Sequence, residues 1–260
     1  MHPLASIVDI GLYPLPDASF RAACRATLAE TGVLVMPGFL LPDATESIRR
    51  EGDAKRDSAY FCSQSHNIYL TPPDSDFAGD HIRNLEVISS KGCITDDQVS
   101  EKSALRLLYD DATFRAFLCA VLDESELFAY ADPLSSINLH YAEPGQELGW
   151  HFDNSSFAIT LMIQAPERGG AFEYVKAARD SNAGDMGFAA VQCVLDGATR
   201  PERLAMEPGT LVLFRGRDAL HRVAPIEGSR TRMLAVLAYN SQPGIALSES
   251  ARLTFFGRLG

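Results

Sequence analysis

The sequence predicts a mainly β domain that is buttressed by α-helices at its N-terminal end. Two observations carry this prediction. In the first half of the chain, apolar residues recur at intervals of three and four, which is the spacing of amphipathic helices. From Ser135 onward, short apolar runs alternate with Gly and Pro turn signals, which is the pattern of short strands. Helices followed by strands favour a β-sandwich or barrel core with helices packed against it.

The first predicted elements have clear boundaries. Residues 18–31 place apolar or small side chains on one helical face, and Asp17 is suited to cap this helix while Gly32 is suited to end it. Residues 33–36 have the composition of a buried strand, which Pro37-Gly38 stops. We therefore expect a helix followed directly by a strand at the start of the domain.

A second helix is predicted from Leu41 towards Lys55, and the segment after it is harder to interpret. Residues 58–91 are polar and rich in turn residues, so we expect them to be irregular with some short strands. Long loops in compact domains often cover a substrate, which makes His81, Arg83 and Asn84 candidates for substrate contact. The alternative is an ordinary surface connection.

The remaining elements follow from apolar patterning. A helix over 110–122 would place its aromatic and aliphatic side chains on one face, as expected for packing against a core. Strands are predicted at 137–141, 149–153, 157–163, 171–174, 210–214 and 233–239. Length alone leaves open one large β-rich domain or two smaller ones, because the chain has 260 residues.

Composition disfavours several classes of protein. A formal net charge of −11 argues against a nucleic-acid partner, since such binding depends mainly on Lys and Arg. No apolar run approaches the roughly eighteen residues of a membrane-spanning helix. The first residues lack the basic and apolar regions of a secretory signal, so we expect a cytoplasmic protein.

The cysteines indicate neither a disulfide framework nor a zinc knuckle. There are five of them, an odd number, and they are widely spaced without a Cys-x-x-Cys pair. We expect most of them to be small buried apolar residues.

The strongest functional signal is the segment Gly149-Trp150-His151-Phe152-Asp153-Asn154. An extended backbone directs the side chains of residues i and i+2 to the same face, so His151 and Asp153 would point at one place. His221, which follows a predicted strand, would supply a second imidazole. Two imidazoles and one carboxylate on one side of a metal form the facial triad of non-haem Fe(II) sites. The tripeptide alone is weak, and His221 alone would more often be structural.

Two arginines open the last strong strand. Alternation places Arg232 on the same side as Asn240, and if that side faces the metal, Arg232 is suited to hold a dicarboxylic cosubstrate through a bidentate contact. Arg230 would lie further out, at the rim of the pocket or exposed to solvent. His140 shares a strand face with Asn138, and it either lines the pocket or makes an ordinary polar contact.

These residues together resemble a known superfamily. His151-Phe152-Asp153, the strand 209–214, His221-Arg222-Val223 and Arg232 look like the Fe(II)/2-oxoglutarate-dependent dioxygenases. The segment 150–154, Gly169-Gly170-Ala171-Phe172-Glu173-Tyr174 and Phe255-Phe256-Gly257-Arg258 are similar to the group of free-amino-acid radical halogenases and their hydroxylase relatives.

The resemblance implies a fold and a set of cofactors. It implies a double-stranded β-helix of the jelly-roll or cupin type, in a single domain of residues 1–260 with a helical part over about 1–134 and a core over about 135–245. It further implies Fe(II), 2-oxoglutarate and O₂, with the metal on His151, Asp153 and His221. The cosubstrate would contact Arg232, with Asn138 and Arg230 as further candidates.

The resemblance also bears on the reaction. The halogenases of this group have Gly or Ala where the metal carboxylate would stand, which makes room for chloride, whereas this chain has Asp153. Hydroxylation is therefore the implied outcome, although family members that desaturate or cyclise keep the same triad. The candidate substrate residues are Arg83, Asn154, Asn240 and His140.

We therefore expect a hydroxylase that acts on a free amino acid or a similar small polar metabolite and releases succinate and CO₂. One alternative is a natural-product tailoring oxygenase that desaturates or cyclises its substrate. An alternative of another class is a β-barrel protein that binds a metal or ligand without turnover. We expect no nucleic-acid partner and no membrane segment, and the sequence leaves a dimer open.

Overall fold

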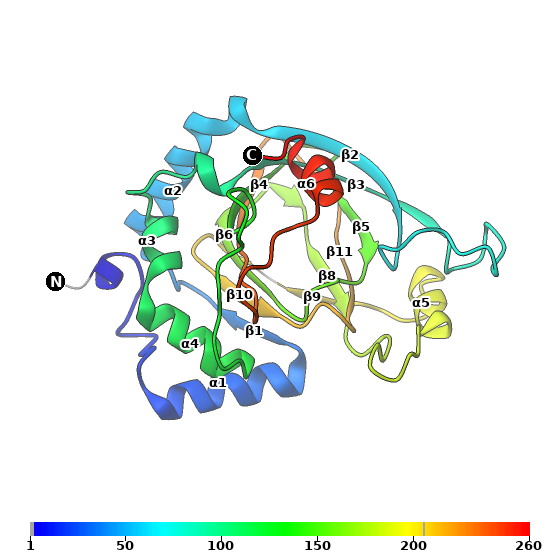
Figure 1. Cartoon of the computed structure of the whole chain (residues 1–260), viewed down its shortest axis with the longest axis horizontal. Coiled ribbons are helices and arrows are strands. Elements are labelled where there is room, and N and C mark those ends of the chain that lie inside the picture. The colour runs from blue at the N-terminus through cyan, green and yellow to red at the C-terminus, as the bar shows by residue number, and fades with distance from the viewer. Residues whose placement is uncertain (1–2, 205) are drawn as a thin grey trace.

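A curled antiparallel sheet forms the centre of the molecule in the computed structural model, which describes residues 3–204 and 206–260 (Figure 1). In the described residues, eleven strands join in the order β1-β10-β6-β13-β4-β3-β5-β11-β8-β9, with β2 paired to β3. The strands are β1 Val33–Met36, β2 Tyr60–Asn67, β3 Glu86–Ile94, β4 Ile137–Ala142, β5 Leu148–His151, β6 Ala158–Gln164, β8 Phe172–Val175, β9 Glu202–Leu204, β10 Leu211–Phe214, β11 Leu220–Val223 and β13 Arg232–Leu237. The short strands β7 Arg168–Gly169 and β12 Ile226–Glu227 pair separately. The predicted β fold is confirmed, and it is the jelly-roll type of core.

Four helices lie together on one side of the curled sheet (Figure 1). They are α1 Ala18–Thr31, α2 Pro42–Lys55, α3 Ala104–Asp110 and α4 Ala112–Leu122. Two further helices, α5 Phe188–Leu195 and α6 Glu249–Phe256, lie elsewhere on the molecule, with α6 against β2 and β3. Short 3₁₀ turns occur at Pro3–Ser6, Arg56–Ser58 and Asp96–Gln98.

The helix boundaries follow from the caps. The Asp17 carboxylate accepts a hydrogen bond from the Phe20 amide, and Gly32 ends α1 in the left-handed conformation, as the sequence predicts. The predicted helix over 110–122 begins later, at Ala112, because the Asp111 carboxylate caps it and separates it from α3.

Strand alternation divides the sheet into an outer and an inner face. On β4 and β13, the outward residues Leu139, Tyr141, Met233 and Ala235 are buried in the main core beneath the helices. The residues between them point into the curl of the sheet, where the cavities described below lie. The helices thus cover the outer face of the sheet, and the inner face lines the cavities.

The prediction of an irregular segment with short strands over residues 58–91 is right for its middle part but underestimates the strands at its two ends. Residues 60–67 and 86–94 form the two longest described strands, β2 and β3, which pair in register from Tyr60↔Cys93 to Asn67↔Glu86, while residues 68–85 between them belong to no helix or strand. The burial of β2 explains the error, because its partly buried residues alternate with exposed ones but are mainly polar. β1, β2 and β3 all precede residue 135, so part of the sheet comes from the region that was expected to be helical. No helix in the described part of the chain has the length and apolar character needed to cross a membrane.

Candidate metal centre and its two cavities

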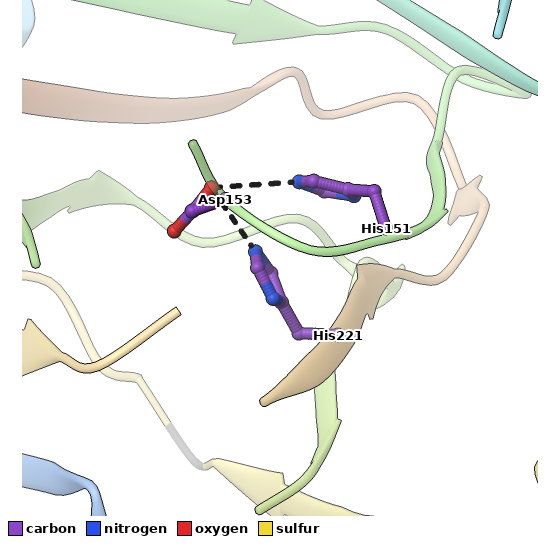
Figure 2. Close-up of side chains that lie close together, drawn as sticks. All are labelled: His151, Asp153 and His221. Atoms are coloured by element: carbon purple, nitrogen blue, oxygen red, sulfur yellow. Dashed lines mark ion pairs between the residues drawn. The ribbon is translucent and has the colours of Figure 1, made fainter. Parts of the chain in front are cut away.

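Three side chains converge at one point inside the curl of the sheet. His151 ends β5, Asp153 follows two residues later, and His221 lies on β11 directly opposite His151 in the strand register. Asp153 Oδ1 lies 3.9 Å from His151 Nε2 and 3.5 Å from His221 Nε2 (Figure 2). One ligand atom from each residue lies within 4.8 Å of the others, which is compact enough for all three to bind a single metal ion.

The backbone fixes the tautomer of each imidazole. His151 Nδ1 donates to the Gly149 carbonyl at 2.7 Å, and His221 Nδ1 donates to the Ala219 carbonyl at 2.9 Å. Because a carbonyl can only accept, the proton is on Nδ1 in both rings and Nε2 keeps its lone pair. This arrangement presents two neutral imidazole ligands to the same point.

The protonation states suit metal binding. Burial, followed by the nearby His221, lowers the pKa of His151 to about 3, so its ring is neutral near pH 7. Burial alone would raise the pKa of Asp153, but its contacts with His221 and His151 outweigh that effect and lower it. At neutral pH the carboxylate is ionised and the His151 ring is unprotonated.

A glycine makes room for the Asp153 carboxylate. A Cβ added to Gly216 would lie 1.9 Å from Asp153 Oδ2 and 2.6 Å from its Cγ, which no side chain can tolerate. The Asp153 amide donates to the Gly216 carbonyl at 3.0 Å, so the two backbones are also joined. Arg179 lies over the Phe152 ring at 4.2 Å and donates to the Arg217 carbonyl at 2.7 Å, which braces the same segment. Gly216 was not predicted as part of the site, because a glycine can follow a strand for many structural reasons.

An ion-pair row supports the strand that carries His221. Glu173 is 1% exposed and lies opposite Arg222 on β11 and Arg203 on β9, with each guanidinium 2.7 Å from a Glu173 oxygen. Burial opposes ionisation of Glu173, but the two arginines outweigh it and lower its pKa. Arg222 also lies over the Trp150 ring at 4.7 Å, which ties this row to the strand of His151.

Arg232 lies in the wall of a cavity that includes the three converging side chains. This cavity, which we call the inner cavity, has a volume of about 280 Å³. Arg232 is 4% exposed, its Nε has no hydrogen-bond partner, and its guanidinium makes no ion pair with any described residue. Burial lowers its pKa to about 10, which leaves it charged at neutral pH. Since a buried cation without a partner is costly, this residue fits an anionic group that enters the cavity.

A second cavity of about 630 Å³ shares four lining residues with the first, namely Lys91, Leu148, His151 and Asp153. We call it the outer chamber. It is lined mainly by polar side chains of β2, β3 and the loop between them, and by one face of α6. His66 of this wall lies edge-on to the His151 ring, with 6.1 Å between ring centroids, and its Nε2 lies 2.7 Å from Ser89 Oγ. These wall residues were missed, because the strands that carry them were not predicted.

Two of the predicted pocket residues line these cavities. His140 lines the inner cavity, with its Nε2 3.2 Å from Lys91 Nζ. Asn154 borders the outer chamber and is exposed. Asn84, one of the loop candidates, also borders the outer chamber, while its neighbour His81 stacks on Phe77.

Other candidate residues have partners outside the cavity walls. Asn138 donates to the carbonyls of Leu134 and Ile137, at 2.7 and 2.9 Å. Arg230 is exposed and donates to the Pro166 carbonyl at 3.2 Å. The cosubstrate role expected of these two side chains stays a prediction.

The last two candidates lie near the edges of the site. Arg83 donates to the Pro72 carbonyl, and its Nε lies 3.8 Å from a carboxylate oxygen of Asp74. Asn240 is held by a backbone bridge to Phe128, and its amide nitrogen is buried without a partner. Neither residue is part of the walls of the two cavities.

The family model of halogenase D matches residues 17–252. The chain belongs to the halogenase D family. The superfamily predicted from the sequence is thereby confirmed. No curated protein matches the chain in sequence.

Solved structures show the same fold at low sequence identity. An oxidoreductase of the 2OG-Fe(II) oxygenase family from Burkholderia pseudomallei is 16% identical, with a TM-score of 0.53 over 86% of this chain and 92% of that one. The prolyl hydroxylase of Trichoplax adhaerens, in complex with a hypoxia inducible factor peptide fragment, is 11% identical, with a TM-score of 0.57 over 86% and 90%. The non-haem α-ketoglutarate-dependent carbocyclase SnoK from nogalamycin biosynthesis is 11% identical, with a TM-score of 0.57 over 89% and 90%.

Family and fold together make this chain an enzyme of the 2-oxoglutarate and Fe(II) oxygenase superfamily, and they imply Fe(II), 2-oxoglutarate and O₂ as its cofactors. The residues fit these groups. His151, Asp153 and His221 offer the N₂O ligand set that suits Fe(II), and unpaired Arg232 offers a cation for a carboxylate.

Proposed function

We propose that this enzyme hydroxylates an unactivated C–H bond of a free amino acid or a similar small polar metabolite. The observation that carries the proposal is Asp153, whose carboxylate lies within bonding reach of the same point as the two histidines. In the halogenases that the sequence resembles, this position is Gly or Ala. A carboxylate here supports hydroxylation over halogenation, because it occupies the place where a halide would bind.

Four residues of the inner cavity have a task in this proposal. His151 and His221 hold the metal through Nε2, while Asp153 contributes one negative charge and Arg232 holds the distal carboxylate of 2-oxoglutarate. Bound Fe(II), 2-oxoglutarate and O₂ supply the oxidation, in which one oxygen atom enters the substrate C–H bond and the other enters succinate, with release of CO₂. The protein's contribution is to hold the substrate C–H close to the metal.

The outer chamber supports a small polar substrate. It meets the metal site at His151 and Asp153, and its walls offer amide, hydroxyl and imidazole groups from Gln64, Ser89 and His66. A volume of about 630 Å³ accommodates a metabolite the size of an amino acid. The free amino acid, the single domain and the cytoplasmic location are parts of this proposal.

The test is turnover of an amino-acid panel with Fe(II), 2-oxoglutarate and O₂, analysed by mass spectrometry. The proposal expects one amino acid to gain one oxygen atom, with formation of one equivalent of succinate. A loss of two hydrogens would instead identify desaturation or cyclisation, and addition of chlorine in the presence of chloride would identify halogenation. Fe(II) and 2-oxoglutarate binding without succinate formation from any substrate would favour a non-catalytic binding protein.

A further inference from the structure

Lys91 of β3 is a cation that the proposed chemistry has not used. It borders both the inner cavity and the outer chamber. Its Nζ lies 3.2 Å from His140 Nε2 and 5.7 Å from the centre of the Phe255 ring. Within the described residues it makes no ion pair with any carboxylate. Burial lowers its pKa, as expected for an ammonium group without a counter-ion.

The strand register places Lys91 beside Arg232. In the sheet, β3, β4 and β13 are consecutive neighbours. Arg232 lies directly opposite Ala142 of β4, and the pairing of Gly92 with Tyr141, continued by one residue, places Lys91 opposite Ala142 on the other side. Residues that lie opposite one another on adjacent strands point to the same face, and two strand spacings separate the two Cα atoms by about 10 Å.

The inner cavity therefore has a cationic end. Lys91, His140 and Arg232 line it from three neighbouring strands. Among the described lining residues, Asp153 is the only acid, and it belongs to the metal site. Arg232 alone is enough to neutralise one carboxylate. Lys91 therefore adds a second positive charge to the same end of the cavity.

We propose that Lys91 acts with Arg232 to hold the distal carboxylate of 2-oxoglutarate, so that this carboxylate is bound by two cations from opposite sides of Ala142. The inference rests on the proposed use of 2-oxoglutarate. Lys91 is a positioning residue, since it binds the end of the cosubstrate that does not react. Because Lys91 also borders the outer chamber, a substrate anion is the competing occupant, and the experiment separates the two.

The experiment measures binding to the full chain loaded with Mn(II), by calorimetry, with two probes. 2-Oxoglutarate has both carboxylates, whereas 2-oxobutyrate keeps the oxo-acid end and lacks the distal carboxylate. Lys91→Met should weaken 2-oxoglutarate binding about tenfold or more, as expected for loss of a charged hydrogen bond, and leave 2-oxobutyrate binding unchanged. Lys91→Arg should restore most of the 2-oxoglutarate affinity.

The matched control is Lys176→Met, which removes the charge of an exposed lysine and should leave both affinities unchanged. Thermal unfolding of the metal-free variants checks the fold, and Lys91→Met should not lower the melting temperature because it removes a buried charge that lacks a carboxylate partner. Equal loss for both probes, or no loss for 2-oxoglutarate, overturns the inference while the proposed function stands. Failure of the unsubstituted protein to bind 2-oxoglutarate overturns both.

Discussion

Gly216→Ala tests whether Asp153 depends on the space that this glycine leaves. The new Cβ would lie 1.9 Å from Asp153 Oδ2, and an ordinary contact begins near 3.4 Å, so this oxygen must move by about 1.5 Å. The Cγ atom at 2.6 Å must move too, and because the carboxyl group is rigid, the oxygen that faces the histidines moves with it. A functional site tolerates displacements of only about 0.5 Å.

We therefore expect Gly216→Ala to weaken divalent metal binding by about 10- to 100-fold, the size of effect seen when the support of a metal ligand is lost. The assay is a titration of the apoprotein with Co(II) or Fe(II) under anaerobic conditions. Gly79→Ala is the matched control, because a Cβ at Gly79 meets nothing within 4 Å. The Asp153→Gly background provides an internal check, since the clash partner is gone and adding Gly216→Ala should cost little more.

Unchanged metal affinity in Gly216→Ala, in a protein that unfolds at the normal temperature, would show that the Asp153 carboxylate is not held where the structure has it. A large further loss in the Asp153→Gly background would show that the alanine acts through the backbone instead. Either result refutes the steric argument.

Three further predictions follow from single side chains. Arg232→Met should raise the dissociation constant of 2-oxoglutarate by about tenfold or more while metal binding alone is retained, as measured by calorimetry. Asp153→Gly should abolish or severely reduce hydroxylation, and full retained activity in the mass-spectrometric assay would mean that Asp153 does not bind the metal. Glu173→Gln should lower the unfolding free energy by about 1–2 kcal/mol at pH 7, a modest value because Arg203 reaches solvent. Since the pKa of Glu173 is lowered in the folded protein, its contribution is full above the ordinary value of 4.5 and is lost as pH falls through the folded-state pKa, so the melting temperatures of the two proteins should converge in acid.

Much of the fold was predictable because its signals are local. The Asp17 cap, the glycine at the end of α1 and the apolar strands β1, β4, β6 and β10 each depend on neighbouring residues. The hairpin of β2 and β3 was missed for a physical reason. Its chamber-side residues are mainly polar and line a cavity instead of packing into a core, so the apolar alternation that predicts a strand is absent.

The site residues were likewise predictable where their signals are local, and were missed where their role depends on neighbouring strands and loops. The spacing of His151 and Asp153 on an extended backbone directed both to one point, and His221 joined them through a strand register that the sequence order only suggested. Lys91 and Gly216 were not predicted, because their significance depends on which strands and loops lie beside them. Arg232 was assigned to the face with the cavity from alternation along its strand, and it lines that cavity.

The most direct test of whether His151, Asp153 and His221 hold one iron ion is anaerobic addition of Fe(II) and 2-oxoglutarate to the protein, followed by measurement of visible absorbance. We expect a weak charge-transfer band that requires both ligands, that is lost in His151→Ala and His221→Ala, and that decays with formation of succinate when substrate and O₂ are admitted. A band that persists without either histidine, or no band and no succinate under any condition, would contradict the claim that these side chains hold one iron ion.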